Sequence, residues 1–289
     1  MKEKLKSVNI ITGDVMLKKY KNEIIFFYLF SAAALVVALF VDLKLDIFLN
    51  NPKNPIAIWF CNTGEMPSRL ICPIAGFLIY KLADKKAHRN LGLFIELGGS
   101  AYLGYHIADY FFLEENSIIF GIVYGIGFGL FLLFIGKFIV IPEEYKRVLI
   151  ILSAAGIAVM AVQTLTIEGV KFLWGRVRFR DLLASGSYDA FTSWFHPNGI
   201  NGNKSFPSGH TAGAGMSYLI MTLPYLSDKF KEKKTLLFII AFIYTGIVGF
   251  TRLVMGAHYL SDVTVGGLVS FTCVIIAMKI IDKKNSVEA

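Results

Sequence analysis

Charged residues are scarce in this chain. Asp, Glu, Lys and Arg make up 17% of its 289 residues, whereas a soluble globular domain carries about 25%. Hydrophobic residues make up 55%, and they recur in continuous runs that are long enough to cross a bilayer. This composition excludes an ordinary soluble domain and predicts an integral membrane protein whose first partner is the lipid bilayer.

Cysteines are also few, and the chain has no linker. Cys61, Cys72 and Cys273 are odd in number and fit no disulfide or metal-ligand spacing, so we expect them to be small packing residues. No internal repeat of about 20–50 residues and no Pro/Ser-rich stretch divides the sequence, which predicts a single membrane domain over residues 1–289. The net charge of +8 forms no single basic stripe, so we expect no nucleic-acid partner. The sequence predicts no oligomeric state.

The apolar runs predict an all-α, multi-pass transmembrane helical bundle of about eight spans. The predicted spans are 24–41, 69–82, 91–113, 118–136, 148–170, 208–226, 235–251 and 259–281. No small-residue cleavage site follows the first run, so we expect it to be retained as a span. The second span is the weakest, because Pro73 interrupts it. Residues 42–68 are rich in Asn and Pro and predict an outer loop with one short interfacial helix.

The distribution of lysine and arginine orients these spans. With the N-terminus in the cytoplasm, the inner segments and the C-terminal tail hold 20 of the 29 basic residues, as the positive-inside rule requires. Both termini are then cytoplasmic, and the short loops favour a bacterial plasma (inner) membrane. Five of the nine outer cations lie in or beside the motifs described below, so these exceptions to the rule are candidates for chemistry. They are Lys171, Arg176, Arg178, Arg180 and Arg252.

The fourth span carries a small-residue repeat. Gly121, Gly125 and Gly129 recur at intervals of four residues. Such spacing lets two helix backbones approach closely in lipid. The repeat therefore predicts tight helix packing and no catalytic role.

The third span contains ionisable residues. His106 and Asp109 lie in its outer half, and Glu96 lies deeper. One interpretation is that they make hydrogen bonds between helices. The other is that His106 and Asp109 line a headgroup pocket and tune the choice of ligand.

A cluster of cations follows the fifth span. Lys171 ends that span, Arg178 comes seven residues later, and Arg176 and Arg180 lie on either side of Arg178. A lone lysine at the end of a span commonly just reaches the interface. Four cations within ten residues on the outer side favour a different interpretation, because guanidinium forks and an ammonium group match the oxygens of a phosphate.

The sixth span opens with Pro207, Ser208, Gly209 and His210. Proline and serine are typical of the first turn and the cap of a helix, so an ordinary helix start is one interpretation. The free backbone amides of Ser208 and Gly209 can also bind an anion, and Gly209 lets that anion come close. The ordinary interpretation leaves His210 in the first turn unexplained.

Arg252 ends the seventh span and His258 begins the eighth, with Gly256 in the tight connection between them. His258 and Asp262 are four residues apart and share one face of a helix. Alone, such a pair is commonly a surface pair. In a membrane protein, ionisable groups point to function, and a carboxylate that accepts the proton of one ring nitrogen exposes the other nitrogen as a nucleophile.

In this order and on one membrane face, the three motifs resemble the type 2 phosphatidic acid phosphatases, which share their site with glucose-6-phosphatase and the vanadium-dependent haloperoxidases. The family pattern is Lys-x6-Arg-Pro, Pro-Ser-Gly-His and Ser-Arg-x5-His-x3-Asp. The matching residues are Lys171, Arg178, Ser208, Gly209, His210, Arg252, His258 and Asp262. Phe179 replaces the family proline and Thr251 replaces the serine, which leaves the shape of the first outer loop open. The resemblance covers the motif-bearing core, residues 148–281.

The resemblance implies a six-helix phosphatase core, to which we expect the hairpin 91–136 to be an addition. The implied phosphate-binding residues are Lys171, Arg178, Ser208, Gly209 and Arg252. His258 is implied to attack phosphorus and form a phosphohistidine, with Asp262 orienting it. His210 is implied to protonate the departing oxygen and then to activate water. The resemblance implies neither a metal ion nor another cofactor.

A site at the edge of the bilayer suits a phosphate or pyrophosphate carried by a membrane lipid, because the lipid need not leave the bilayer. We therefore expect such a substrate, whether phosphatidic acid, phosphatidylglycerophosphate, undecaprenyl pyrophosphate or a lipid A phosphate. A soluble ester such as a sugar phosphate is the alternative. Two other classes stay open, namely a haloperoxidase that holds vanadate and a transporter or scaffold that binds phosphate without hydrolysing it.

Overall fold

The computed structural model describes residues 16–111 and 117–288, and within them every regular element is a helix. In chain order these are α1 (Met16–Lys19), α2 (Lys21–Leu49), α3 (Pro55–Thr63), α4 (Met66–Arg69), α5 (Ile71–Leu82), α6 (Lys86–Phe111), α7 (Ser117–Gly136), α8 (Glu143–Trp174), α9 (Phe179–Ser185), α10 (Gly209–Gly215), the 3₁₀ helix η1 (Met216–Tyr225), α11 (Asp228–Glu232), α12 (Lys234–Val254) and α13 (Leu260–Glu288). The predicted all-α class is confirmed. Lys2, Lys4, Lys6 and residues 112–113 of the third predicted span lie outside the described residues.

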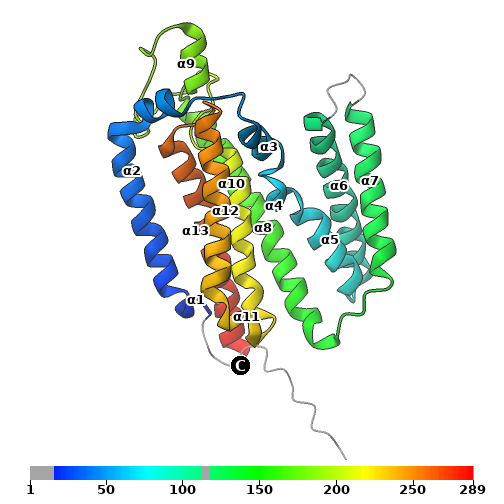
Figure 1. The fold of residues 1–289 in the computed structure, drawn as a ribbon. Coiled ribbons are helices and arrows are strands. Elements are labelled where there is room, and N and C mark those ends of the chain that lie inside the picture. Colours follow the sequence, from blue (N-terminus) through cyan, green and yellow to red (C-terminus); the bar gives the residue numbers. More distant parts are fainter. Residues whose placement is uncertain (1–15, 112–116, 289) are drawn as a thin grey trace, which may run out of the picture.

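The long helices run side by side in a bundle (Figure 1). Helices α8, α10, α12 and α13 form its centre, and α2 packs on one side against α12 and α13. On the other side α5 packs against α8 and connects the centre to the hairpin of α6 and α7. The short helix α9 lies at the end of the bundle opposite the C-terminus.

Five helical stretches are long and apolar enough to cross a membrane. They are Lys21–Leu49, Ile118–Gly136, Glu143–Ser185, Lys234–Val254 and Leu260–Lys284, and five of the eight predicted spans fall within them. The other three predicted spans are largely helical over the residues that the structure describes. However, α5 has only 12 residues, which is roughly 18 Å of helix, and Pro224 lies inside η1. The chain is a multi-pass membrane protein, and the count of eight spans stays a prediction.

The segment predicted as an outer loop is more helical than expected. The first helix continues through Leu49, and two short helices follow instead of one. Asn54 caps α3, where its side chain accepts hydrogen bonds from the amides of Ile56 and Ala57 at 3.0 Å each. Proline stands in the first turn of both α3 and α4. Asn54 and Pro55, two of the residues that predicted a loop, therefore act as a helix start.

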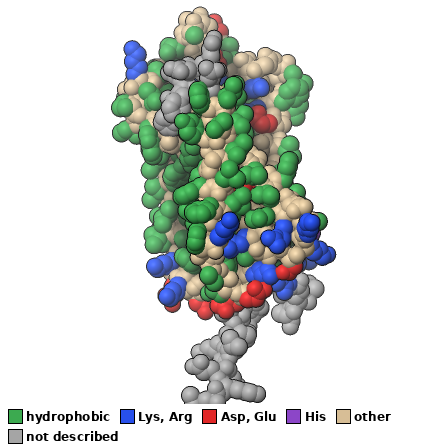
Figure 2. All heavy atoms as spheres, turned by 90° about the vertical axis from the view of Figure 1, so that its right-hand side faces the viewer, with side chains coloured by type: hydrophobic (Ala, Val, Ile, Leu, Met, Phe, Trp, Pro, Cys, Tyr) green, Lys and Arg blue, Asp and Glu red, His purple; other side chains and the backbone are tan. Residues whose placement is uncertain are grey.

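The predicted close packing of the fourth span is confirmed. A β-carbon added to Gly121 would lie 2.7 Å from the carbonyl oxygen of Gly104 on α6 and 2.8 Å from the β-carbon of Ala108. Only glycine permits this approach of α6 and α7. Figure 2 shows the side of the molecule that carries this hairpin, with hydrophobic side chains along its length and charged side chains mainly at the lower end, where the C-terminus lies.

The core has two parts along the bundle. The larger cluster is aromatic, and its centre is a stack of Phe27 on α2 and Phe271 on α13, whose ring centroids lie 3.9 Å apart. A smaller cluster at the opposite end joins Phe179, Leu182 and Tyr259. The smaller cluster supports the loop between α8 and α9 and the start of α13, which carry the predicted site residues.

Candidate active site

The three sequence motifs meet near the end of the bundle that carries α9. A cavity of about 1070 Å³ lies there between α8, α10, α12 and the α3–α6 segment, and six of the predicted site residues line it. They are Lys171, Arg178, Gly209, His210, Arg252 and His258. Two glycines with positive φ turn the chain around the site, Gly175 at the end of α8 and Gly256 between α12 and α13. Tertiary packing therefore brings together residues that are up to 87 positions apart in the sequence.

His258 is held in one tautomer. Its Nδ1 lies 2.7 Å from the carbonyl oxygen of Ser205, and a carbonyl can only accept, so Nδ1 carries the proton and Nε2 is the free nitrogen. Burial lowers the pKa of His258 from 6.5 to about 4, and the charges of Arg252 and Arg178 act in the same direction against the opposing Asp262. The imidazole is therefore neutral, with a lone pair at Nε2.

Asp262 lies closer to Ser205 than to this histidine. Its Oδ2 lies 3.6 Å from His258 Nδ1, which is longer than a hydrogen bond, whereas the Ser205 hydroxyl donates to the same oxygen at 2.5 Å. The amide of Tyr259 also donates to it, at 3.0 Å. The expectation that Asp262 directly accepts the proton of the ring is thus corrected, because the peptide carbonyl of Ser205 occupies that place.

Arg176 ties this group to the first span. Its guanidinium is fully buried and lies 2.5 Å from Asp262 Oδ1 and 2.9 Å from Asp42 Oδ2 on α2. It also donates to the Ser261 hydroxyl at 2.8 Å and lies over the ring of Tyr259, 4.1 Å from its centroid. Sequence reasoning noticed Arg176 only as an outer cation and missed Asp42. A carboxylate inside an apolar span was the available signal.

The cations of the cavity carry nitrogens that are buried and have no hydrogen-bond partner among the described residues. These atoms are Nε of Arg178 and both Nε and Nη1 of Arg252. Because buried polar groups are nearly always paired in proteins, such nitrogens indicate a site for an anion. Lys171 lies beside them and pairs with Glu168 at 2.6 Å.

Gly209 lines the cavity, whereas Ser208 is buried outside it. A β-carbon on Gly209 would lie 2.8 Å from the Lys171 ammonium nitrogen, so glycine is what lets the lysine approach. Ser208 caps α10, as predicted, and its hydroxyl accepts from the amide of Thr211 at 3.3 Å. Its own amide donates to the carbonyl of Asp262 at 2.9 Å, and the residue is fully buried and does not line the cavity. Ser208 therefore shapes the helix start, and we do not assign it to the phosphate.

His210 faces a carboxylate that sequence reasoning missed. Its Nδ1 lies 3.1 Å from Glu65 Oε1, and its Nε2 is buried with no hydrogen-bond partner among the described residues. Glu65 in turn pairs with the buried Arg69 at 2.7 Å. The signal in the sequence was this acidic and basic pair, four residues apart, in a segment otherwise poor in charge.

The comparisons with known proteins agree with this geometry. The family profile described as the PAP2 superfamily matches residues 147–286, a segment that contains all three motifs. Through this segment the chain belongs to the PAP2 superfamily. Its members are helical phosphatases, so the chain is a PAP2 phosphatase. No curated protein and no solved structure matches it.

The two departures from the PAP2 pattern have structural explanations. Phe179 takes the first position of α9, where proline is favoured because that amide needs no partner within the helix and because the fixed φ of proline suits a helix start. Its ring is 1% exposed and packs with Leu182 and Tyr259, so it anchors the loop that carries Arg178. Thr251 is buried, and its hydroxyl donates to the carbonyl of Val248 at 2.7 Å, away from the cavity.

The three ionisable residues of the third predicted span differ in their position relative to the cavity. His106 lines the cavity of the PAP2 site, whereas the exposed Asp109 does not. Glu96 is fully buried, and it accepts a hydrogen bond of 3.3 Å from Ser100 on its own helix, rather than the bond between helices that we expected.

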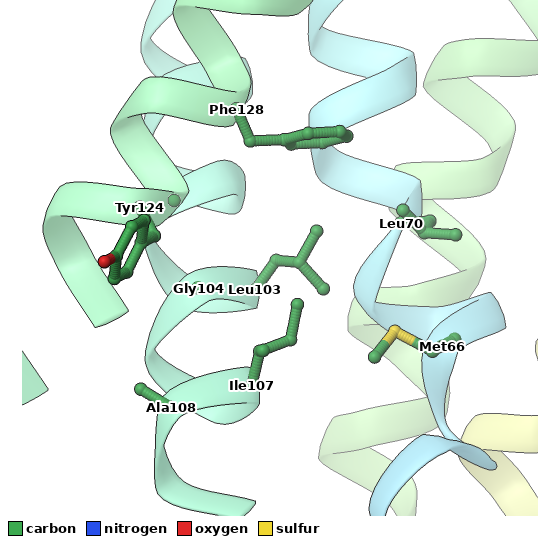
Figure 3. A pocket seen from close by; sticks show the side chains of 9 residues that line it. Met66, Leu70, Leu103, Gly104, Ile107, Ala108, Tyr124 and Phe128 are labelled. Carbon is green, nitrogen blue, oxygen red and sulfur yellow. The ribbon is translucent and has the colours of Figure 1, made fainter. Parts of the chain in front are cut away.

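A second cavity of about 480 Å³ lies between α4, α6 and α7 (Figure 3). No acid, histidine or cation lines it, and we assign it no chemistry.

Proposed function

We propose that this PAP2 phosphatase hydrolyses a lipid phosphate or pyrophosphate monoester at the outer membrane surface, through a phosphohistidine intermediate. The observation that carries the proposal is one cavity that brings a neutral, tautomer-locked His258 together with His210 and with the cations of the motifs, Lys171, Arg178 and Arg252. A site that only binds phosphate needs the cations, whereas it does not need a histidine with a free Nε2.

In the first step Lys171, Arg178 and Arg252 hold the phosphate oxygens and stabilise the negative charge of the transition state. Nε2 of His258 donates its lone pair to phosphorus, and a phosphorus–nitrogen bond forms as the bond to the leaving oxygen breaks. His210 gives the proton from its Nε2 to that oxygen, which leaves as an alcohol or, from a pyrophosphate, as a lipid monophosphate.

In the second step a water molecule attacks the phosphohistidine. His210 now accepts a proton from the water, the phosphorus–nitrogen bond breaks, and its electron pair returns to Nε2 of His258. Inorganic phosphate leaves and both histidines are restored. Asp262 stabilises the charge on His258 during this cycle and, through the Ser205 hydroxyl, holds the carbonyl that orients the ring.

The shape of the cavity supports a lipid substrate. Its walls on α6 and α8 are mainly apolar side chains and glycines, among them Phe94, Gly98, Met160 and Leu165, with polar side chains such as Gln163 between them. One cavity thus combines a cationic end with an apolar end, which is the pattern of an amphiphile with a phosphate head. Exposed apolar neighbours on both helices, such as Leu91 on α6 and Val162 on α8, suit contact with lipid.

The charge distribution supports a site on the outer side of the plasma (inner) membrane. The cavity lies at the end of the bundle that carries α9, and the C-terminus lies at the other end. Basic residues are concentrated in the segments at the C-terminal end, which the positive-inside rule assigns to the cytoplasm. The site then faces the periplasm or the cell exterior.

The test is phosphate release by the detergent-purified protein and by His258→Ala, in chelator. The panel contains lipid monophosphates, lipid pyrophosphates and soluble sugar phosphates. We expect release from a lipid substrate by the wild type, loss of release in the variant, and a base-stable, acid-labile phosphoenzyme in the wild type alone. Preference for a sugar phosphate would replace the lipid assignment. Absence of release from every substrate, with inorganic phosphate still bound, would refute the phosphatase in favour of a binding protein.

A further inference from the structure

The two histidines of the site have different acceptors at Nδ1. For His258 the acceptor is a neutral peptide carbonyl at 2.7 Å. For His210 the neighbour is a carboxylate, Glu65 Oε1, at 3.1 Å. A carboxylate next to an imidazole favours its protonated form, whereas a carbonyl fixes the tautomer without adding charge. These Nδ1 neighbours therefore favour a neutral His258, which suits a nucleophile, and a protonated His210, which suits a proton donor.

The surroundings of His210 make this carboxylate necessary. Burial acts most strongly on the ring, and four groups that carry or can carry positive charge add to its effect, namely Arg252, His258, Arg69 and Lys171. All of them oppose a proton on His210, and the leaving oxygen needs that proton. Glu65 is the carboxylate in ion-pair contact with the ring among the described residues.

Glu65 is itself held in place. Its Oε2 pairs with Arg69 at 2.7 Å, and Arg69 is buried and also donates to the carbonyl of Asn62. On the other side α10 passes very close, because a β-carbon on Gly213 would lie 3.0 Å from Glu65 Cγ. Gly213, about one turn after His210 on α10, thus leaves space for the side chain of Glu65 next to the imidazole ring of His210.

From these contacts we propose that Glu65 is the positioning residue of the general acid. It holds the Nδ1 proton of His210, stabilises the imidazolium, and directs Nε2 to the leaving oxygen. Glu65 lies between α3 and α4, outside the segment 147–286 that the PAP2 profile matches. The N-terminal half of the chain would then contribute directly to catalysis. This inference rests on the proposed phosphatase function.

The test uses two soluble monoesters that differ in how much their leaving group needs a proton. An alkoxide leaving group needs protonation, whereas nitrophenolate departs without it. The rate of phosphoenzyme formation is measured in single turnover with an alkaline quench, for butyl phosphate and for p-nitrophenyl phosphate. In Glu65→Gln we expect a loss of about 10- to 100-fold with butyl phosphate and less than about threefold with p-nitrophenyl phosphate. Glu65→Met, which removes the acceptor as well as the charge, should lose more with butyl phosphate.

Glu168→Gln is the matched control. Glu168 is a second carboxylate that lines the cavity, and it pairs with Lys171 instead of a histidine. Its loss should change the two esters by the same factor. Equal slowing of both esters in Glu65→Gln, or no slowing of either, would overturn the inference. If the wild type releases phosphate from neither ester nor from the lipid panel, the proposed function itself fails. Binding of inorganic phosphate by Glu65→Gln reports whether the variant has folded.

Discussion

Arg176 and Asp42 form a buried ion pair between the loop after α8 and the first long helix. The pair measures 2.9 Å and is shared with Asp262, so one guanidinium connects α2 to the carboxylate behind His258. The separation of 134 residues means that the motif-bearing half of the chain depends on the N-terminal half for its alignment.

Breaking this pair should therefore destabilise the protein and its site together. Asp42→Asn weakens the charge-assisted hydrogen bonds that Asp42 accepts from Arg176 and Ser261, while Arg176 keeps Asp262 as its ion-pair partner. We therefore expect the substitution to cost about 1–3 kcal/mol. The measurement is the midpoint of unfolding in detergent, together with phosphate release. Asp228→Asn, which removes the exposed partner of Lys231 at the other end of the bundle, should leave both unchanged. An unaltered midpoint in Asp42→Asn would contradict the structural role.

Asp262 and Ser205 should differ in their effects on catalysis. Asp262→Asn removes the charge that faces His258 and should lower the rate of phosphohistidine formation by about 10²–10⁴-fold. Ser205→Ala removes only the hydroxyl, and the Ser205 carbonyl still accepts from Nδ1. We expect its loss to be about tenfold or less. Single-turnover phosphoenzyme formation measures both variants, and a Ser205→Ala loss equal to that of Asp262→Asn would show that the hydroxyl has a direct role.

His258 should stay neutral well below neutral pH. Its pKa is lowered from 6.5 to about 4 by burial, so the folded protein resists a proton that the unfolded chain accepts. The contribution to stability is complete above about pH 6.5 and is lost as the pH falls towards 4. In an NMR titration of histidine-labelled protein, the resonance that disappears in His258→Ala should titrate near pH 4. A midpoint at 6.5 or above would contradict the assignment.

Gly98 offers a test of the apolar end of the cavity. A β-carbon there would have no heavy atom within 4 Å, so Gly98→Leu fills the groove without a steric clash. If the side chain excludes three or four methylenes of a lipid tail at about 0.8 kcal/mol each, kcat/KM for a long-chain phosphate falls roughly 100-fold. Release from butyl phosphate should not change.

Gly127 on α7 is the control for this substitution. It is equally exposed and equally free of neighbours, and it does not line the cavity. Gly127→Leu should keep the ratio of long-chain to short-chain activity. A ratio that falls in both variants would point to a general effect on the hairpin instead of a tail-binding groove.

Much of the fold followed from local patterns. The apolar runs predicted the long helices, and the glycine repeat of the fourth span predicted the close contact of α6 and α7. The error in 42–68 came from the same kind of pattern, because Asn54 and Pro55 are as typical of a helix start as of a loop. Such a choice depends on what the short helix packs against, and α3 packs against α12, almost 200 residues later.

The sequence by itself determined that the chain lies in a membrane, that it is helical, and which motif residues end their helices on the same side. Those properties depend on composition and on spacing along the chain. Only the tertiary structure decided that the Ser205 carbonyl holds His258, that Glu65 contacts His210, and that Arg176 pairs with Asp42 and Asp262. These contacts join segments that are far apart in the sequence, and their existence depends on how the helices pack, which local spacing does not encode.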